Sequence, residues 1–209
     1  MTAKRGSSAN SKGSDGEREV AKSLSKWTGE NFMRTLQSGA GGTRAVDDLR
    51  MTGDIFAPLG SKNSFSYEVK NHSGVTLYNV FNNNGEIPSF WEQCTTDCRR
   101  VSKFGYSPML IFKIEYRGTY CIFPYTDWAI NEIKNNDGRY LLTQIGYSVK
   151  RNSAKYMFPV LVTNMKTLIT LDHNKMFDVY RGLKWDVKPM VFKKRRPAKK
   201  LIDSLLKDE

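Results

Sequence analysis

Residues 53–72 read GDIFAPLGSKNSFSYEVKNH, two short apolar runs that are separated by a turn-forming segment and that both carry an acid. We predict strands over residues 54–58 and 64–70, because each run is rich in β-forming residues and the Gly-Ser-Lys-Asn sequence between them favours a turn. The two strands should form a hairpin. Acids at positions where each strand should pack need a partner, and this predicts a functional role for them.

Side chains alternate along a strand, so Glu68 and Lys70 should face the same side of the second strand. If Asp54 begins the partner strand, its carboxylate can approach Glu68 closely enough for both to hold one divalent cation. Carboxylate, backbone and water oxygens are the ligands that Mg²⁺ prefers. Such a cation can bind a phosphate oxygen and lower the pKa of its bound water, while Lys70 can orient or help to deprotonate that water.

The elements around the hairpin alternate between helices and strands, which predicts an α/β fold with a central mixed β-sheet flanked by helices. Apolar residues recur at helical spacing after Ser14, and again after Ser89, where Ser89 and Glu92 form a capping-box pattern. The other elements that we expect are a short strand at NFMR, a strand pair PMLIFKIEY and GTYCIFP, a capped helix TDWAINEI, strands RYLLTQIGYSV, KYMFPVLVTN and TLITLD, and a short helix DHNKMFDVYRGL.

Composition divides the chain into three parts. Residues 1–13 hold small and basic residues without a large apolar one, which is typical of a flexible arm. Residues 14–135 carry the regular pattern of helices and strands and form the main domain. Residues 136–209 are less regular and read as a basic C-terminal extension that can pack on the core.

The charge balance points to an anionic partner. The chain has 33 Lys and Arg against 21 acids, a net charge of +12 and a pI near 9.6. These values are expected for a nucleic-acid partner, with an anionic membrane surface as the weaker alternative. No long apolar run or charged-then-apolar leader is present in the sequence, so we expect a cytoplasmic, intracellular protein, which can be viral, and no membrane partner.

The three cysteines, Cys94, Cys98 and Cys121, suit a reducing compartment because they are few and odd in number. Cys94 and Cys98 lie four residues apart on an expected helix and could together coordinate a metal ion. Only His72 and His173 remain to complete such a site, so buried thiols are the preferred interpretation. We also leave His72 out of the catalytic set, although it follows the EVK strand.

Glu17 shares the buried face of the first expected helix, because Val20, Ala21 and Leu24 follow it at three, four and seven residues. A carboxylate there needs a partner, which a metal or a lysine would supply, and the helix amino terminus also favours an anion. The alternative is that Glu17 interacts with the helix dipole in solvent.

The acid, spacer and EVK pattern resembles the PD-(D/E)XK nuclease superfamily, which has an acid at the start of one strand, then an acid, any residue and a lysine on the next. Here it appears as GDI and EVK, with Gly53 in the place of the superfamily's proline. The order GEREVAKSL, FMRTLQSG, GDI and EVK, followed by a helix and a strand pair ending in FP, is more narrowly similar to the archaeal-type Holliday junction resolvases of that superfamily. This resemblance covers residues 14 to about 128 and implies a restriction-endonuclease-like core.

By this resemblance Glu17, Asp54 and Glu68 would form the metal site, Lys70 would be the catalytic lysine, and Ser38 would approach the scissile phosphate. The interval between Ser38 and Asp54 is long, and Asp47 and Asp48 compete with Asp54 as the acid. Asp54 is preferred because it adjoins the β-like IFA run. The implied cofactor is Mg²⁺, with Mn²⁺ as its substitute, and the implied assembly is a homodimer, since a four-way junction needs two equivalent incisions.

Candidate DNA contacts come from two basic regions. Arg34 and Arg44 flank a glycine-rich loop where the backbone could approach DNA, although an ordinary surface loop explains the glycines equally well. PMVFKKRRPAKK at residues 189–200 contains six bases and no acid: Lys193, Lys194, Arg195, Arg196, Lys199 and Lys200. They could contact phosphates or remain a solvated charge run. Tyr78 and Phe81 could stack on exposed bases, whereas core packing is preferred for Trp91.

The sequence therefore favours a Mg²⁺-dependent endodeoxyribonuclease that cleaves branched DNA and resolves Holliday junctions in DNA recombination and repair. A restriction-like or repair nuclease on linear duplex would use the same metal site. A non-catalytic basic DNA-binding protein is the remaining alternative, for which the net charge alone is sufficient. The coincidence of Glu17 and Ser38 with the hairpin acids favours an enzyme.

Overall fold

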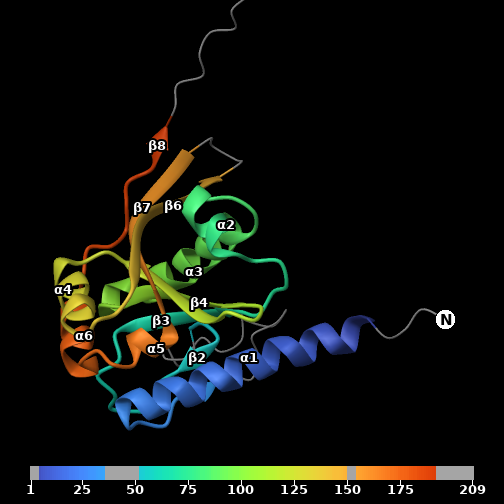
Figure 1. Ribbon diagram of the computed structural model, residues 1–209. Helices are drawn as coiled ribbons and strands as arrows, with labels where there is room; N and C mark the ends of the chain where they lie inside the picture. Colours follow the sequence, from blue (N-terminus) through green and yellow to red (C-terminus); the bar gives the residue numbers. More distant parts are fainter. Residues whose placement is uncertain (1–4, 36–51, 150–153, 192–209) are drawn as a thin grey trace, which may run out of the picture.

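The computed structural model describes residues 5–35, 52–149 and 154–191 of the chain, in which one mixed sheet lies between two groups of helices (Figure 1). The elements in chain order are α1 (Arg5–Thr28), β1 (Met33–Arg34), β2 (Ile55–Phe56), β3 (Phe65–Lys70), α2 (Leu77–Asn82), α3 (Ile87–Val101), the 3₁₀ turn η2 (Ser102–Phe104), β4 (Ser107–Ile114), β5 (Gly118–Pro124), α4 (Asp127–Asn135), β6 (Tyr140–Val149), β7 (Ala154–Asn164), α5 (Met165–Leu168), α6 (His173–Tyr180) and β8 (Met190–Val191).

The strands follow the order β1-β2-β3-β4-β5-β7-β6, and β8 pairs with β7. The pair β2–β3 is antiparallel, as the predicted hairpin requires, with Ile55 opposite Tyr67. The pair β3–β4 is parallel, with Glu68 opposite Leu110, and α3 lies in the crossover between them. The remaining pairs are antiparallel. The predicted mixed sheet flanked by helices is thus confirmed, and it has the form of a restriction-endonuclease-like core.

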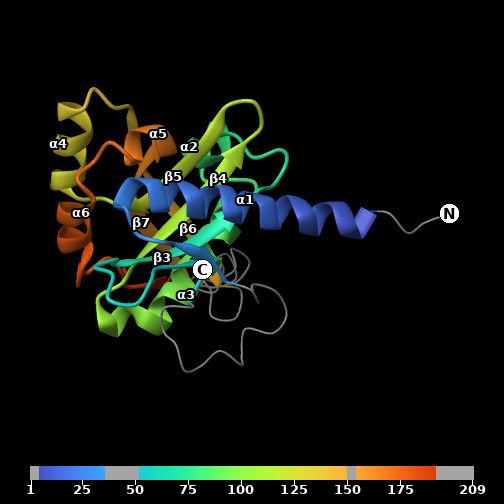
Figure 2. The same cartoon turned by 90° about the horizontal axis from the view of Figure 1, so that it is seen from below.

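Each face of the sheet has its own apolar core. One core joins α1, α4, α5 and α6 to the sheet and includes Leu24, Trp27 and Phe177. Figure 2 shows α1 lying across the strands on this side. The other core joins α2 and α3 to β4, β6 and β7, with Trp91 fully buried. The helical spacing of Trp91, Cys94, Cys98 and Val101 predicted this buried stripe, and all four are buried.

Three local predictions differ from the structure. First, α1 begins at Arg5, where the sequence predicted a flexible arm over residues 1–13, and its first turns project beyond the sheet (Figure 2). Second, α3 begins at Ile87 with Pro88 in its first turn, so Ser89 is not the cap; its hydroxyl donates to the Glu86 carbonyl at 2.8 Å.

The third difference is TLITLD, which is not a strand. The Asn164 side chain accepts the backbone N–H of Thr167 at 2.8 Å and starts α5 there. Met165, Leu168 and Leu171 then lie three residues apart and are all buried, so their spacing matches a helical turn. An apolar run of this length fits a strand and a buried helical turn equally well.

The C-terminal part belongs to the same sheet. β7 lies between β5 and β6, so the segment from residue 136 to Val191 completes the fold and is not appended to a finished domain. Residues 183–191, which we name the C-terminal strap, return over α3. Arg99 holds Asp186 through two hydrogen bonds of 2.8 and 2.9 Å, and the Trp185 indole N–H donates to the Tyr106 carbonyl at 2.9 Å.

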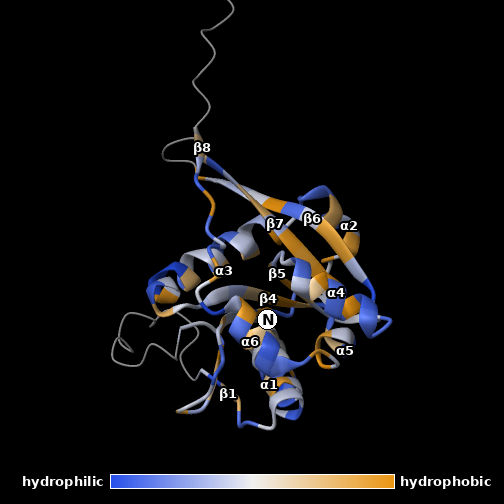
Figure 3. Cartoon of the chain, turned by 90° about the vertical axis from the view of Figure 1, so that its left-hand side faces the viewer, coloured by the Kyte–Doolittle hydropathy of each residue, from blue (hydrophilic) through white to orange (hydrophobic). Residues whose placement is uncertain are grey.

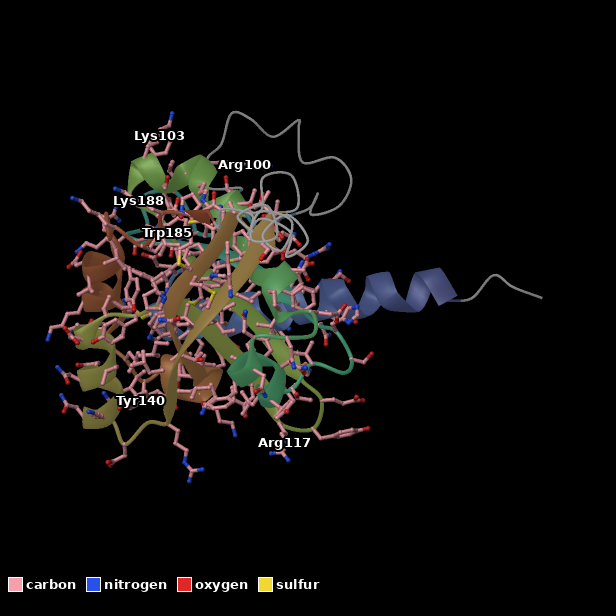
Figure 4. All side chains as sticks on the ribbon, turned by 90° about the horizontal axis from the view of Figure 1, so that it is seen from above. Arg100, Lys103, Arg117, Tyr140, Trp185 and Lys188 are labelled. Carbon is pink, nitrogen blue, oxygen red and sulfur yellow. The ribbon has the colours of Figure 1, made fainter. Side chains whose placement is uncertain are left out.

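Basic side chains gather at the end of the molecule that the C-terminal strap reaches. Figure 4 shows Arg100, Lys103 and Lys188 pointing outward near Trp185. The positively charged segment of residues 193–200 follows the strap in the sequence and lies outside the described residues. None of the helices that the structure describes is long and apolar enough to cross a membrane.

Candidate nuclease site

Asp54 is positioned by the glycine that precedes it. Gly53 has a φ of +94°, and a Cβ added there would lie 2.4 Å from the Tyr67 carbonyl oxygen. This conformation and this close approach suit only glycine. Proline has its φ fixed near about −65° and could not take this place. The structure therefore explains why GD stands where the superfamily pattern has PD.

The backbone and side chain of Asp54 both bond to the neighbouring strands. Its N–H donates to the Tyr67 carbonyl at 2.8 Å, and its carbonyl accepts the Thr35 N–H at 2.9 Å. Its carboxylate accepts the Val69 N–H at 2.8 Å and is buried. The carboxylate thus lies at the end of the hairpin, directed toward β3.

β3 places Glu68 and Lys70 together, as the alternation of side chains predicts. The Lys70 Nζ donates to the Glu68 carboxylate at 2.5 Å and to the Gln93 side-chain oxygen on α3 at 3.0 Å. The Glu68 side chain is 4% exposed and that of Lys70 is 21% exposed. The Lys70 ammonium is therefore partly accessible to solvent, whereas the Glu68 carboxylate is buried. Phe90 also covers Lys70, with its ring centroid 5.6 Å from the Nζ.

Both acids hold their protons more tightly than usual. Burial raises the pKa of Asp54 to about 6, and the nearby Glu17 charge adds to this, whereas the bond from Val69 opposes it. Burial raises the pKa of Glu68 to about 7, and the charge of Asp54 adds to this, whereas Lys70 opposes it. Two buried carboxyl groups that repel each other are a feature of functional sites, where a cation relieves the repulsion.

Glu17 lies near this pair, but its direct partner is Arg34. The Arg34 Nε donates to the Glu17 carboxylate, and the two side chains are 25% and 12% exposed. The expected partner was a metal or a lysine, so an arginine from β1 takes that place. Glu17 also lies in the interior of α1 and not in its first turn, so the helix amino terminus does not stabilise it. Its influence on the pKa of Asp54 ties it to the site.

Two residues of α3, which packs on the face of the sheet opposite to α1, also lie near the site. The side-chain oxygen of Gln93 accepts a hydrogen bond from the Lys70 Nζ. Asp97 was missed: its charge raises the pKa of both Asp54 and Glu68, and it pairs with Arg100 at 3.2 Å. Gln93 and Asp97 are four residues apart and share one helix face. No signal in the sequence was sufficient to find Asp97, because its approach to the two acids depends on how α3 packs against β3.

The other predicted site residues are not placed. Ser38, Arg44, Lys193, Lys194, Arg195 and Arg196 lie outside the described residues, as do Asp47 and Asp48. The described residues therefore bring together Asp54, Glu68 and Lys70, with the Glu17–Arg34 pair at the edge.

The three predicted metal ligands, Glu17, Asp54 and Glu68, are not grouped as one metal site in the structure. Among residues 5–35, 52–149 and 154–191, no three His, Cys, Asp or Glu side chains are grouped so that they could hold a metal ion by themselves. Cys94, Cys98 and Cys121 are buried free thiols, as predicted, and burial raises the pKa of each. His72 is exposed and its Nδ1 pairs with Glu86 at 2.6 Å. Any metal at the hairpin would be held by two carboxylates with water and substrate oxygens.

Comparison with known proteins agrees with this chemistry. Neither a search of curated proteins nor a search of solved structures gives a match. A model of the family described as "Phage putative PDDEXK endonuclease" matches residues 8–178. The match includes α1, the hairpin with Asp54, Glu68 and Lys70, and α3. Because it spans well over half of the 209 residues, the chain belongs to this family of phage PDDEXK endonucleases.

Proposed function

We propose that this endonuclease is a divalent-metal-dependent DNA hydrolase in which Asp54 and Glu68 hold the metal and Lys70 is the catalytic lysine. The observation that carries the proposal is the pair of buried carboxyl groups on adjacent strands, next to a lysine that opens to solvent. Glu17 would be the third carboxylate of the site, acting through water, because its direct partner is Arg34.

The donor set fits Mg²⁺, with Mn²⁺ as a substitute. Mg²⁺ keeps several waters and is usually bound through one or two carboxylates together with phosphate oxygens, so two acids are sufficient. The raised pKa values of Asp54 and Glu68 arise from burial, with the charge of Glu17 adding to that of Asp54 and the charge of Asp54 adding to that of Glu68, and a cation would relieve this repulsion. When bound, the metal supplies Lewis acidity and lowers the pKa of its water.

The protein groups would supply position and proton handling. Lys70 is held between Glu68 and Gln93, so its ammonium is fixed beside the carboxylates where it can orient the attacking water. The Phe90 ring lies against the Lys70 ammonium, which helps to hold it in place. The Val69 N–H fixes one Asp54 oxygen and leaves the other for a ligand.

For the substrate, we propose branched DNA, with resolution of Holliday junctions in recombination and repair as the reaction. The resemblance of GEREVAKSL, FMRTLQSG, GDI and EVK to the archaeal-type resolvases supports this. Two equivalent cuts in a four-way junction require two sites, so the proposed active form is a homodimer. Ser38 would approach the scissile phosphate in each subunit, and Arg34 and Arg44 would bring positive charge beside it.

One cleavage experiment tests the chemistry and the substrate together. A labelled four-way junction, a matched linear duplex and a single strand are incubated with wild type, Asp54→Asn and Lys70→Ala, in Mg²⁺, Mn²⁺ or EDTA. Asp178→Asn and Lys175→Ala, both exposed on α6, are matched controls. We expect metal-dependent junction cleavage that the two site variants lose and the two control variants keep.

Two outcomes contradict parts of the proposal. Equal cleavage by wild type and Asp54→Asn would refute the assigned site. Cleavage of linear duplex alone would refute the junction substrate and select a restriction-like or repair nuclease that uses the same site. Sedimentation of the protein with the junction tests the homodimer, because a complex with a single subunit would exclude it.

We also propose that Lys193, Lys194, Arg195 and Arg196 contact DNA phosphates. A chain that ends at Val191 keeps β8 and loses these bases. Each phosphate contact contributes about 0.9 to the slope of log K against log salt, so the truncated chain should bind DNA less tightly and with a shallower slope. An unchanged slope would show that the segment is only a solvated charge run.

A further inference from the structure

The short helix α2 presents an apolar ridge to solvent. Leu77, Tyr78 and Phe81, which we name the α2 ridge, are 36%, 70% and 64% exposed. Positions i, i+1 and i+4 share one side of a helix, so the three side chains form one contiguous surface. Figure 3 shows that part of α2 is coloured as hydrophobic although it lies at the outside of the molecule.

The rest of α2 is fixed in a way that keeps this ridge outward. Thr76 and Asn79 form a capping box at its start, and Val80 is fully buried beneath it. At its end Asn83 takes a left-handed conformation with φ of 50°. The Asn83 amide donates to the Gly146 carbonyl at 3.1 Å and accepts the Gly146 N–H at 2.9 Å. With both ends and the inner face held, the ridge cannot rotate into the core.

The α2 ridge belongs to the segment that links the two halves of the candidate site. Residues 71–86 leave β3 directly after Lys70 and lead into α3, which returns Phe90 and Gln93 to that same lysine. The turn between β4 and β5, which carries the exposed Arg117, lies on the same side of the molecule as α2 (Figures 2 and 4). An exposed cation and exposed aromatic rings therefore occur on one side of the molecule, on segments that directly follow β4 and β3.

Rings beside cations suit nucleic acid with unpaired bases. Aromatic side chains bind single strands by stacking on successive bases, with basic groups contacting the backbone. Paired bases inside a duplex have their faces covered, so they offer no surface to such a ridge. The net charge of +12 and the nuclease family already favour a DNA partner.

We propose that the α2 ridge stacks on an unpaired base next to the scissile phosphate and so selects DNA with single-stranded character at the cleavage point. This rests on the proposed function, because it assumes that substrate lies across Lys70. A fork or a flap has such bases where its single strand leaves the duplex, and a four-way junction would offer them only where pairs open at the crossover. The ridge thus accounts for substrate choice by a physical contact that linear duplex cannot make.

Equilibrium binding tests the contact without cleavage. The full chain carrying Asp54→Asn is titrated, in EDTA, against a fork and a matched duplex that contain 2-aminopurine, whose fluorescence changes on stacking. Tyr78→Ala with Phe81→Ala is compared with Tyr140→Ala, a 37% exposed aromatic residue at the start of β6 that lies away from Arg117 in Figure 4. Stacking contributes about 1–3 kcal/mol per base. We therefore expect about 10-fold weaker binding of the fork and loss of the fluorescence change, with duplex binding altered by less than about 2-fold.

Several results would overturn the proposal. These are an equal loss of affinity for fork and duplex, an equal effect of Tyr140→Ala, or no binding to any DNA. A change in sedimentation of the free protein would instead identify the ridge as a contact between copies of the chain. The melting temperatures of the variants verify folding, since all three replaced side chains are exposed. Failure of the proposed function would be seen in a different experiment, the cleavage assay, in which Asp54→Asn would still cut DNA.

Discussion

Replacing Glu68 by Gln should stabilise the metal-free protein at pH 8, although it removes a residue of the proposed active site. Burial and the charge of Asp54 raise the pKa of Glu68 from 4.5 to about 7. A carboxyl group whose folded pKa is raised contributes stability that is fully present below its unfolded pKa and is lost as the pH rises through the folded pKa. Each pKa unit corresponds to about 1.36 kcal/mol, so the full difference is about 3 kcal/mol.

The measurable quantity is how the difference in free energy of unfolding between wild type and Glu68→Gln changes with pH. Over the window from pH 5 to pH 8 the free energy of unfolding of wild type should fall by about 2 kcal/mol relative to Glu68→Gln. For a chain of this size this is about 4–8 °C in melting temperature. Thermal and urea unfolding in EDTA at several pH values measures it. Glu115→Gln, at the exposed turn between β4 and β5, is the matched control and should follow wild type.

The result that refutes this reasoning is equally specific. If Glu68→Gln is less stable than wild type at pH 8, or if the gap between the two does not widen with pH, then the buried carboxylate is not strained in the absence of metal. The bond from Lys70 would then compensate fully for its burial.

Three further predictions concern the same region and the C-terminal strap. Mg²⁺ should raise the melting temperature of wild type more at pH 8 than at pH 6, because protons compete with the metal, and it should have no such effect on Asp54→Asn. Gly53→Ala should cost at least about 2 kcal/mol in urea unfolding, because it forces a positive φ and a contact with the Tyr67 carbonyl; an unchanged midpoint would contradict this. Asp186→Asn should cost less than about 1 kcal/mol because Arg99 and Asp186 are partly exposed, yet faster hydrogen exchange in residues 183–191 should reveal a loosened strap.

The parts of the site that follow from local chemistry could be predicted. Alternation along one strand placed Glu68 beside Lys70, and the turn sequence after Asp54 predicted the hairpin. Asp97 could not be found in this way, because its proximity depends on how α3 packs against β3. The pairing of Glu17 with Arg34 likewise depends on the docking of α1 beside β1, and the two residues had been given separate roles.

The same limit applies to the sheet. The strands RYLLTQIGYSV and KYMFPVLVTN were expected, and the structure confirms them as β6 (Tyr140–Val149) and β7 (Ala154–Asn164). Their order was not expected: β7 pairs with β5 and leaves β6 outside, so a segment that read as an extension is part of the sheet. Strand order depends on long-range pairing, for which a single sequence gives no periodic signal.

The contact between α1 and the segment around Leu171 has a consequence for folding during synthesis. The Trp27 indole on α1 donates to the Leu171 carbonyl, 144 residues later, at 2.8 Å, and its ring packs edge-on against Phe177. The packing of α1, the helix that carries Glu17, therefore cannot be completed until about five-sixths of the polypeptide has left the ribosome. Docking of α1 is therefore a late event in translation. If Glu17 acts as proposed, a fragment that ends before Leu171 would fold its hairpin acids without the third carboxylate fixed beside them.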